Sequence, residues 1–250
     1  MGEKLSNMDA RLSIIHKRLA NISQIISVAS GKGGVGKSLI ASSLALNLSK
    51  KGYNVGLLDL DLYGPSSHII LGVKTDSFPE EEKGIIPPDI NGIKFMSIVY
   101  YTEDKPSPFR GIDISNIIIE LLAITQWGKL DYLIIDMPPG IGDETLDVIR
   151  LVKNSKFLVV TTPSKVALGA VGKLLRLLKE LKISTIGVIE NMTMTKSSYV
   201  SNEICQMKLN YLGSVSFDHK LEYAIGKPEK LMNTEFMKDF DIIIKNHILS

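Results

Sequence analysis

The chain has 250 residues, of which 44% are hydrophobic, so it can bury a substantial core, and we expect one domain over residues 1–250. Its 29 basic and 27 acidic residues nearly cancel, so net charge gives no reason to expect a nucleic-acid partner. A single cysteine, Cys205, excludes an intramolecular disulfide. The first residues lack a signal-peptide core, and the most apolar run, 117–124, is short and carries Glu120. We therefore expect a cytoplasmic protein with no membrane association.

Apolar residues at three- and four-residue spacing predict a helix within residues 1–22. A short apolar run at 25–29 then predicts a strand, which leads into a glycine-rich segment and a second helical stripe that ends near Gly52. This alternation continues along the chain. Apolar runs bounded by turn residues or helices predict further strands at residues 55–61, 132–136, 157–162 and 185–191.

Helical stripes separate these runs, and the clearest comprises Leu168, Val171, Leu175, Leu178 and Leu181. Alternating strands and helices predict an α/β fold with a mostly parallel, doubly wound β-sheet flanked by helices on both faces. Ligands of such sheets bind at the carboxyl ends of the strands. Residues 74–91 and 193–210 interrupt the alternation, and we interpret both as surface excursions.

The glycine-rich segment matches G-x-x-x-x-G-K-[ST], the phosphate loop of P-loop NTPases, and stands between a predicted strand and a predicted helix. Glycines let the backbone wrap a phosphate, so that successive N–H groups and the positive helix end point at the anion. Lys37 would reach the β and γ phosphates of the nucleotide, and the Ser38 hydroxyl would reach Mg2+. We therefore predict a nucleotide-binding core over 24–250, with contacts from Gly31, Lys32, Gly33, Gly34, Val35, Gly36, Lys37, Ser38 and Leu39.

Carboxylates at predicted strand ends supply the other half of a Mg2+ site. Asp136 ends the apolar run 132–135, in the manner of a Walker B strand, and could hold the metal directly or through water. Asp59 and Asp61 are two residues apart on a predicted strand, so we expect their side chains to point to the same side. Two carboxylates that face one phosphate need a cation between them. Each could instead be an ordinary solvated acid at a strand end.

A second lysine in the loop, Lys32, gives the form KGGVGKS, which resembles the deviant Walker A ATPases: nitrogenase iron protein, MinD, ParA and the Mrp/ApbC family. The resemblance implies that Lys32 reaches across a homodimer to the partner's nucleotide. There it would act as an arginine finger does, by neutralising charge that develops on the phosphates. Hydrolysis would then require two subunits that close face to face.

Within that group the chain is most similar to Mrp/ApbC, the iron-sulfur cluster carrier ATPases. The similar segments are DLDLYGPSSH (59–68), FRG (109–111), WGKLDYLIIDMPPGIGDE (127–144), TTPSKVAL (161–168) and IGVIENM (186–192). The resemblance implies that Asp61 orients or activates the attacking water, that Asp136 serves Mg2+, and that Asn191 recognises adenine. It also implies that residues 138–140 form switch II. A guanine-type NKxD signature is absent, which favours ATP over GTP.

The chain departs from that family at three points. Members that carry clusters usually have a C-x-x-C after the ENM segment, whereas this chain has Cys205 alone. A [4Fe-4S] cluster normally takes four cysteine ligands and two copies of Cys205 supply two, so the usual ligand set is excluded. Leu39 and Ile141 stand where threonines are common in the family, and we expect them to retune the nucleotide contacts.

Three functions remain open from the sequence. The first is an Mrp-like ATPase whose partners are iron-sulfur apo-proteins or assembly proteins. The second is a ParA- or MinD-type positioning ATPase, for which the apolar stripe of residues 236–248 could serve as a membrane helix. The polar face of that stripe mixes acidic and basic residues, however, so packing against the core is the better interpretation. The third is a nucleotide-dependent scaffold without a cluster.

Overall fold

The computed structural model describes residues 9–74, 78–102, 112–195 and 197–249. Its centre is an eight-stranded sheet in the order β10-β9-β8-β1-β7-β2-β6-β5, in which every neighbouring pair is parallel except β5 and β6. The strands of this sheet are β1 (Ile22–Ser30), β2 (Val55–Asp59), β5 (Asp89–Ile90), β6 (Ile93–Ser97), β7 (Leu130–Asp136), β8 (Ser155–Thr161), β9 (Thr185–Thr193) and β10 (Tyr211–Ser216). A separate antiparallel pair joins β3 (Glu80–Glu81) to β4 (Ile85–Ile86).

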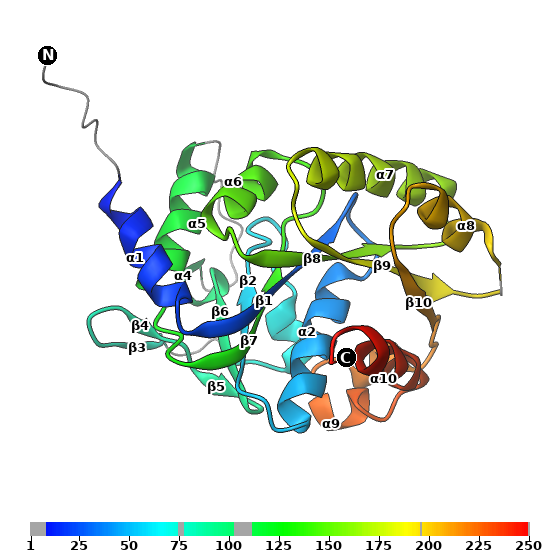
Figure 1. Cartoon of the computed structure of the whole chain (residues 1–250). Coiled ribbons are helices and arrows are strands. Elements are labelled where there is room, and N and C mark those ends of the chain that lie inside the picture. The colour runs from blue at the N-terminus through cyan, green and yellow to red at the C-terminus, as the bar shows by residue number, and fades with distance from the viewer. Residues whose placement is uncertain (1–8, 75–77, 103–111, 196, 250) are drawn as a thin grey trace, which may run out of the picture.

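Helices cover both faces of the sheet (Figure 1). One layer contains α5, α6, α7 and α8, and the other contains α2, α9 and α10, with α3 packed on α2. The bounds are α1 (Ala10–Leu19), α2 (Lys37–Lys50), α3 (Ser67–Leu71), α4 (Val99–Thr102), α5 (Ile112–Ile124), α6 (Asp143–Leu151), α7 (Lys165–Glu180), α8 (Tyr199–Gln206), η1 (Leu221–Ala224), α9 (Pro228–Leu231) and α10 (Glu235–His247). None of the described helices is long and apolar enough to cross a membrane.

The predicted fold class is confirmed. The strand pattern on which the prediction rests arises because helices cover both faces of the sheet. The central strands read as continuous apolar runs because they are buried on both sides, as in β7, where Leu133, Ile134 and Ile135 are all fully buried. The five predicted strands are β1, β2, β7, β8 and β9. The sequence did not predict β6 and β10, nor helix α8, which lies within the predicted excursion 193–210.

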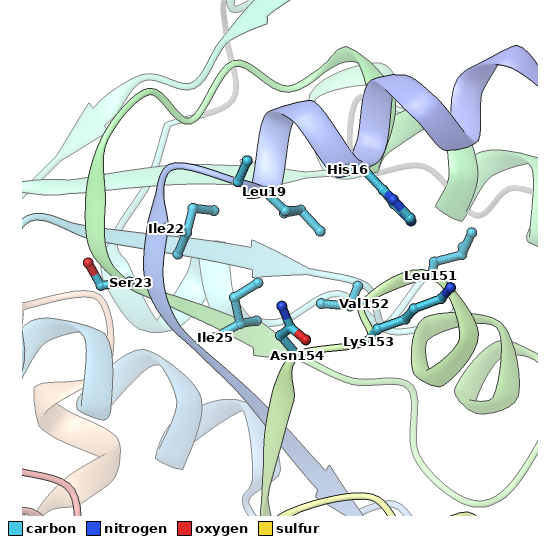
Figure 2. A pocket seen from close by; sticks show the side chains of 10 residues that line it. His16, Leu19, Ile22, Ser23, Ile25, Leu151, Val152, Lys153 and Asn154 are labelled. Atoms are coloured by element: carbon cyan, nitrogen blue, oxygen red, sulfur yellow. The ribbon is translucent and has the colours of Figure 1, made fainter.

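The chain from α1 into β1 borders a cavity of about 430 Å3 at the amino end of β1 (Figure 2). Leu19, Ile22 and Ile25 give it an apolar wall, and the segment 151–154 after α6 closes the other side. The phosphate loop follows the opposite end of β1. This cavity is therefore separate from the predicted nucleotide site.

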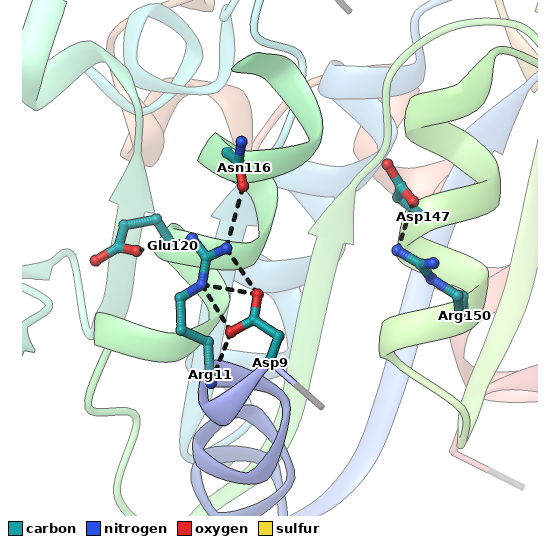
Figure 3. Close-up of polar contacts among 6 residues, drawn as sticks. All are labelled: Asp9, Arg11, Asn116, Glu120, Asp147 and Arg150. Atoms are coloured by element: carbon teal, nitrogen blue, oxygen red, sulfur yellow. Dashed lines mark hydrogen bonds and ion pairs between the residues drawn. The ribbon is translucent and has the colours of Figure 1, made fainter. Parts of the chain in front are cut away.

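The predicted N-terminal helix is present as α1, and it packs on α5. Arg11 forms the main link: its guanidinium binds Asp9 at 2.7 Å, Asn116 at 3.1 Å and Glu120 at 3.4 Å (Figure 3). A serine hydroxyl of α5, Ser115, in turn donates to Asp147 of α6. Helix α5 is thus bonded to α1 on one side and to α6 on the other. The FRG segment (109–111) lies outside the described residues.

The apolar stripe of α10 is buried, which confirms the prediction that it packs against the core. Its polar side is fastened to α2 through Asp241, whose carboxylate binds Asn47 Nδ2 at 3.0 Å, Lys51 Nζ at 2.7 Å and Lys245 Nζ at 2.6 Å. Burial acts to raise the pKa of Asp241, but its hydrogen bonds to Lys245, Lys51 and Asn47 outweigh burial and lower the pKa to about 2.

We predict that Asp241→Asn costs about 1 kcal/mol of unfolding free energy at pH 7. Because the pKa of Asp241 is lower in the folded than in the unfolded chain, its contribution is complete above pH ~4 and is lost as the pH falls toward ~2. Urea unfolding of both proteins at pH 7 and pH 3 measures the difference. A difference that does not shrink at pH 3 would contradict the assignment. Glu235→Gln, which removes an exposed pair with Lys238, is the control and should leave stability unchanged.

Candidate nucleotide-binding site

The glycine-rich loop joins β1 to α2, as the sequence predicts. Gly36 precedes the first residue of α2 and has a left-handed backbone with φ 85°, which a residue with a side chain adopts only with strain. A Cβ on Gly36 would also collide with the side-chain amide of Asn191. That amide donates a 2.9 Å hydrogen bond to the carbonyl of Val35. The loop conformation is therefore held from the end of β9.

The loop forms one wall of a cavity of about 310 Å3 at the carboxyl end of the sheet. The opposite wall consists of Asp61, Gly64, Ser66 and Ile70 from the segment after β2, together with Pro139 after β7. Backbone amides of a glycine loop and the positive end of a 14-residue helix converge on this space. These donors suit a chain of phosphates, so the cavity fits the nucleotide that the sequence predicts.

Lys37, the lysine of the loop, lies under this cavity and is 6% exposed. Its Nζ is 2.5 Å from Asp136 Oδ1 and 3.6 Å from Asp61 Oδ2. Burial acts to lower the pKa of Lys37, but the negative charge of Asp136, with that of Asp61 and Asp59, outweighs burial and raises it. Lys37 is thus the cation between the carboxylates. To reach a phosphate, as predicted, its ammonium must turn away from Asp136.

The prediction that Asp59 and Asp61 share one side of a strand is wrong, because β2 ends at Asp59 and Asp61 lies in the turn that follows. Asp59 is completely buried and accepts the backbone N–H groups of Asp61, at 3.0 Å, and Ser67, at 3.2 Å. Burial and the nearby charge of Asp136 raise the pKa of Asp59 to about 8. Burial likewise raises the pKa of Asp61, which lines the cavity.

Ser67 is a site residue to which the sequence assigned no role. It is fully buried at the start of α3, and its hydroxyl donates to Asp136 Oδ2 at 3.0 Å. A serine eight residues after a strand end has no spacing that marks it, although it belongs to the quoted segment 59–68. Its contacts follow from the register of the sheet, in which Asp59 and Asp136 are direct partners on β2 and β7.

The residues predicted to hold Mg2+ are close together, although a metal would need further ligands. Ser38 Oγ lies 3.2 Å from Lys37 Nζ, next to the carboxylates of Asp136 and Asp61. Among the residues that the structure describes, no group of three or more His, Cys, Asp or Glu side chains is arranged to hold a metal. Mg2+ is usually bound by one or two carboxylates plus phosphates and water, so the donor set fits Mg2+ that arrives with a nucleotide.

The remaining predicted residues lie around the same cavity or behind it. Lys32 is partly exposed on the cavity wall, and within the described part of the chain its ammonium has no ion-pair partner. Leu39 lines the cavity. Asn191 is 2% exposed and its amide is engaged with the loop, so its contact with adenine stays a prediction. The segment 138–140, predicted to form switch II, is fixed to β1, since the N–H of Gly140 donates to the carbonyl of Ser30 at 2.9 Å.

Cys205 is separate from these residues, on the outer surface of α8, and it is exposed.

Comparison with known proteins gives consistent matches. The model of the NUBPL iron-transfer P-loop NTPase family, of ParA type, matches residues 21–245. An iron-sulfur cluster carrier protein from Saccharolobus solfataricus is 35% identical over 255 residues, which cover 92% of this chain and 86% of that protein. One from Pseudomonas fragi is 41% identical over 177 residues, or 70% of this chain. The match spans 62% of the Pseudomonas protein, so less than two thirds of that relative is represented here.

Solved structures agree with the fold. A nucleotide-binding protein from Archaeoglobus fulgidus, in complex with ADP, superposes with a TM-score of 0.74 and 29% identity over 92% of this chain and 95% of that one. The cell division ATPase MinD from Pyrococcus furiosus gives a TM-score of 0.67 over 89% and 97% of the two chains. At 20% identity, the MinD match shows a shared fold alone.

We predict that Gly36→Ala abolishes nucleotide binding. The new methyl group adds a collision with Asn191 to the strain of a left-handed backbone. Gly52→Ala is the matched control, because Gly52 has φ 91° but open space around the position of a Cβ. Titration calorimetry with MgATP and thermal unfolding measure both variants. Gly52→Ala should lose about 1 kcal/mol of stability and keep full binding, and equal behaviour of the two variants would refute the role of the Asn191 contact.

Proposed function

Because the chain belongs to the NUBPL iron-transfer family of P-loop NTPases, we propose that it is a homodimeric switch that binds and hydrolyses MgATP and acts in iron-sulfur cluster assembly. The observation that carries the proposal is the buried ammonium of Lys37, which lies between Asp136 and Asp61 beneath a glycine-built cavity. The ammonium of Lys37 could move from Asp136 to the phosphates of a bound nucleotide, and the Mg2+ that accompanies the nucleotide could then take the place of the ammonium beside Asp136.

In the proposed reaction a water molecule attacks the γ-phosphorus of ATP, and the bond from that phosphorus to the β–γ bridging oxygen breaks. Inorganic phosphate and ADP leave. Bound Mg2+ would neutralise phosphate charge, with Ser38 and Asp136 as its protein ligands. Lys37 would leave Asp136 for the β and γ phosphates. Asp61, which lines the cavity, would orient the water and accept its proton.

Lys32 would complete the site of the partner subunit. Its partial exposure on the cavity wall supports this role, since a lysine that acts in trans must be free to leave its own subunit. Positive charge at the γ phosphate stabilises the transition state of phosphoryl transfer, so hydrolysis would occur only in the closed dimer.

The cargo assignment follows from the names of the relatives, which are iron-sulfur cluster carrier proteins. A homodimer brings two copies of Cys205, and a [4Fe-4S] cluster needs four ligands. We therefore propose that this chain does not hold such a cluster alone, and that any cluster at Cys205 takes its other ligands from an assembly partner. The positioning-ATPase alternative is weaker, because the apolar stripe of α10 that it would use as a membrane helix is buried.

We predict that Lys32→Ala reduces ATP turnover by ~100-fold or more at every protein concentration, because positive charge is lost at the transition state. Affinity for MgATP, measured by calorimetry, should change little. Lys173→Ala, which removes an exposed lysine from the outer side of α7, is the matched control and should retain full turnover. Turnover of Lys32→Ala at the level of the native chain would exclude the action in trans.

A second prediction concerns the cluster. Protein purified without air and then incubated with iron and sulfide should stay colourless and hold less than one [4Fe-4S] cluster per dimer, because two thiolates cannot complete the ligand set. Visible absorption and chemical determination of iron and sulfide measure this. A stoichiometric brown product that survives in Cys205→Ser would show that the chain holds a cluster through other residues.

A further inference from the structure

Five residues at the carboxyl edge of the sheet form a closed ring of polar contacts, in which two of the links use a backbone N–H group. Lys37 Nζ binds Asp136 Oδ1, Asp136 Oδ2 accepts the hydroxyl of Ser67, and the N–H of Ser67 donates to Asp59 Oδ2. The ring closes through Asp59 Oδ1, which accepts the N–H of Asp61, and through the 3.6 Å ion pair of Asp61 with Lys37. Ser67 is the member that bonds to both strand ends.

The two carboxylate oxygens of Asp136 have different partners in this ring. Its Oδ1 faces Lys37, the group that must leave when a nucleotide binds, whereas its Oδ2 faces Ser67, which has no such reason to leave. Asp136 and Ser67 are both completely buried, so a carboxylate oxygen that lost the Ser67 hydroxyl would have no water to replace it. A rotation of the Asp136 carboxylate that keeps this hydrogen bond therefore moves the Ser67 hydroxyl with it.

Ser67 is the first residue of α3, and the other end of α3 is tied to a distant segment. The N–H of Gly226 donates to the carbonyl of Ile70 at 3.1 Å. Gly72, which ends α3, lies so close to Gly226 that a Cβ on Gly72 would overlap the Gly226 carbonyl. Gly226 stands between η1 and α9, in the segment 221–231, which we name the η1–α9 segment. Three of its residues, Tyr223, Ala224 and Lys230, line a further cavity of about 670 Å3.

We propose that Ser67 is the positioning residue that transmits the departure of Lys37 from Asp136 through α3 to the η1–α9 segment. The inference rests on the proposed function, since it takes MgATP as the ligand that draws Lys37 away. Helix α3 has five residues and is bonded at both ends, so we expect it to move as one unit. The conformation of the η1–α9 segment would thus depend on whether Asp136 is bonded to Lys37 or to another cation, although this segment is remote from the phosphate loop in sequence.

The first experiment separates a positioning role from a structural one. In Ser67→Ala, affinity for ATP should fall about tenfold in the presence of Mg2+ and stay within about twofold in EDTA, because Asp136 is oriented for the metal and not for the phosphates. The control is Ser155→Ala. This change removes another buried hydroxyl–hydroxyl hydrogen bond, to Ser27 at 2.6 Å, at the amino end of β8. Equal losses with and without Mg2+ would overturn the proposal.

The second experiment tests whether nucleotide binding changes the η1–α9 segment through α3. Amide hydrogen exchange is followed by mass spectrometry with and without a non-hydrolysable ATP analogue and Mg2+, at concentrations that saturate each variant. In the native chain both 67–73 and 221–231 should change their exchange rates. In Ser67→Ala the change at 221–231 should be lost. In Gly72→Ala, where the junction with Gly226 is forced apart, the change should persist at 67–73 and disappear at 221–231.

The outcomes distinguish this inference from the proposed function. If the native chain binds no nucleotide, the proposed function fails and the inference falls with it. If the native chain binds MgATP but 221–231 does not respond, or responds equally in Ser67→Ala, the inference alone is wrong.

Discussion

The ion pair between Lys37 and Asp136 is the interaction on which the rest of the site depends. It is buried, so each partner would be costly to leave without the other. Asp61 adds negative charge beside the same ammonium, whereas burial and the charge of Asp136 raise the pKa of Asp59 to about 8. In the resting site the carboxylates of Asp136 and Asp61 therefore share the positive charge of Lys37. A ligand that takes Lys37 must bring a cation for Asp136, which is why this site suits a nucleotide with Mg2+ better than a free phosphate.

The parallel sheet explains how residues so far apart in sequence come to share one site. Parallel strands place all their carboxyl ends at one edge. Here Lys37 begins the helix after β1, Asp61 follows β2, and Asp136 is the last residue of β7. The register of β2 on β7 sets Asp59 opposite Asp136, close enough for one serine to bond to both. The site is thus a consequence of strand order as much as of the phosphate-loop motif.

Much of this could be predicted from the sequence, because glycine spacing and buried strands leave strong signals. The loop 31–38 and the strand before Asp136 both lie where their patterns place them. The edge strand β10 contains Gly213 and two serines, so it lacks the apolar run that marks a strand buried on both faces. The contacts of Ser67 and the resting partner of Lys37 depend on tertiary packing, which no local pattern encodes.

The packing also connects the nucleotide loop to Cys205, although the two are far apart in sequence. Gly31 lies directly against the backbone of Ala170 and Val171 in α7, so closely that a Cβ could not fit between them. The next residue of α7, Gly172, faces the side chain of Met207, which caps the end of the helix that carries Cys205. The phosphate loop at Gly31 and the helix that carries Cys205 are thus connected through α7 by direct packing contacts.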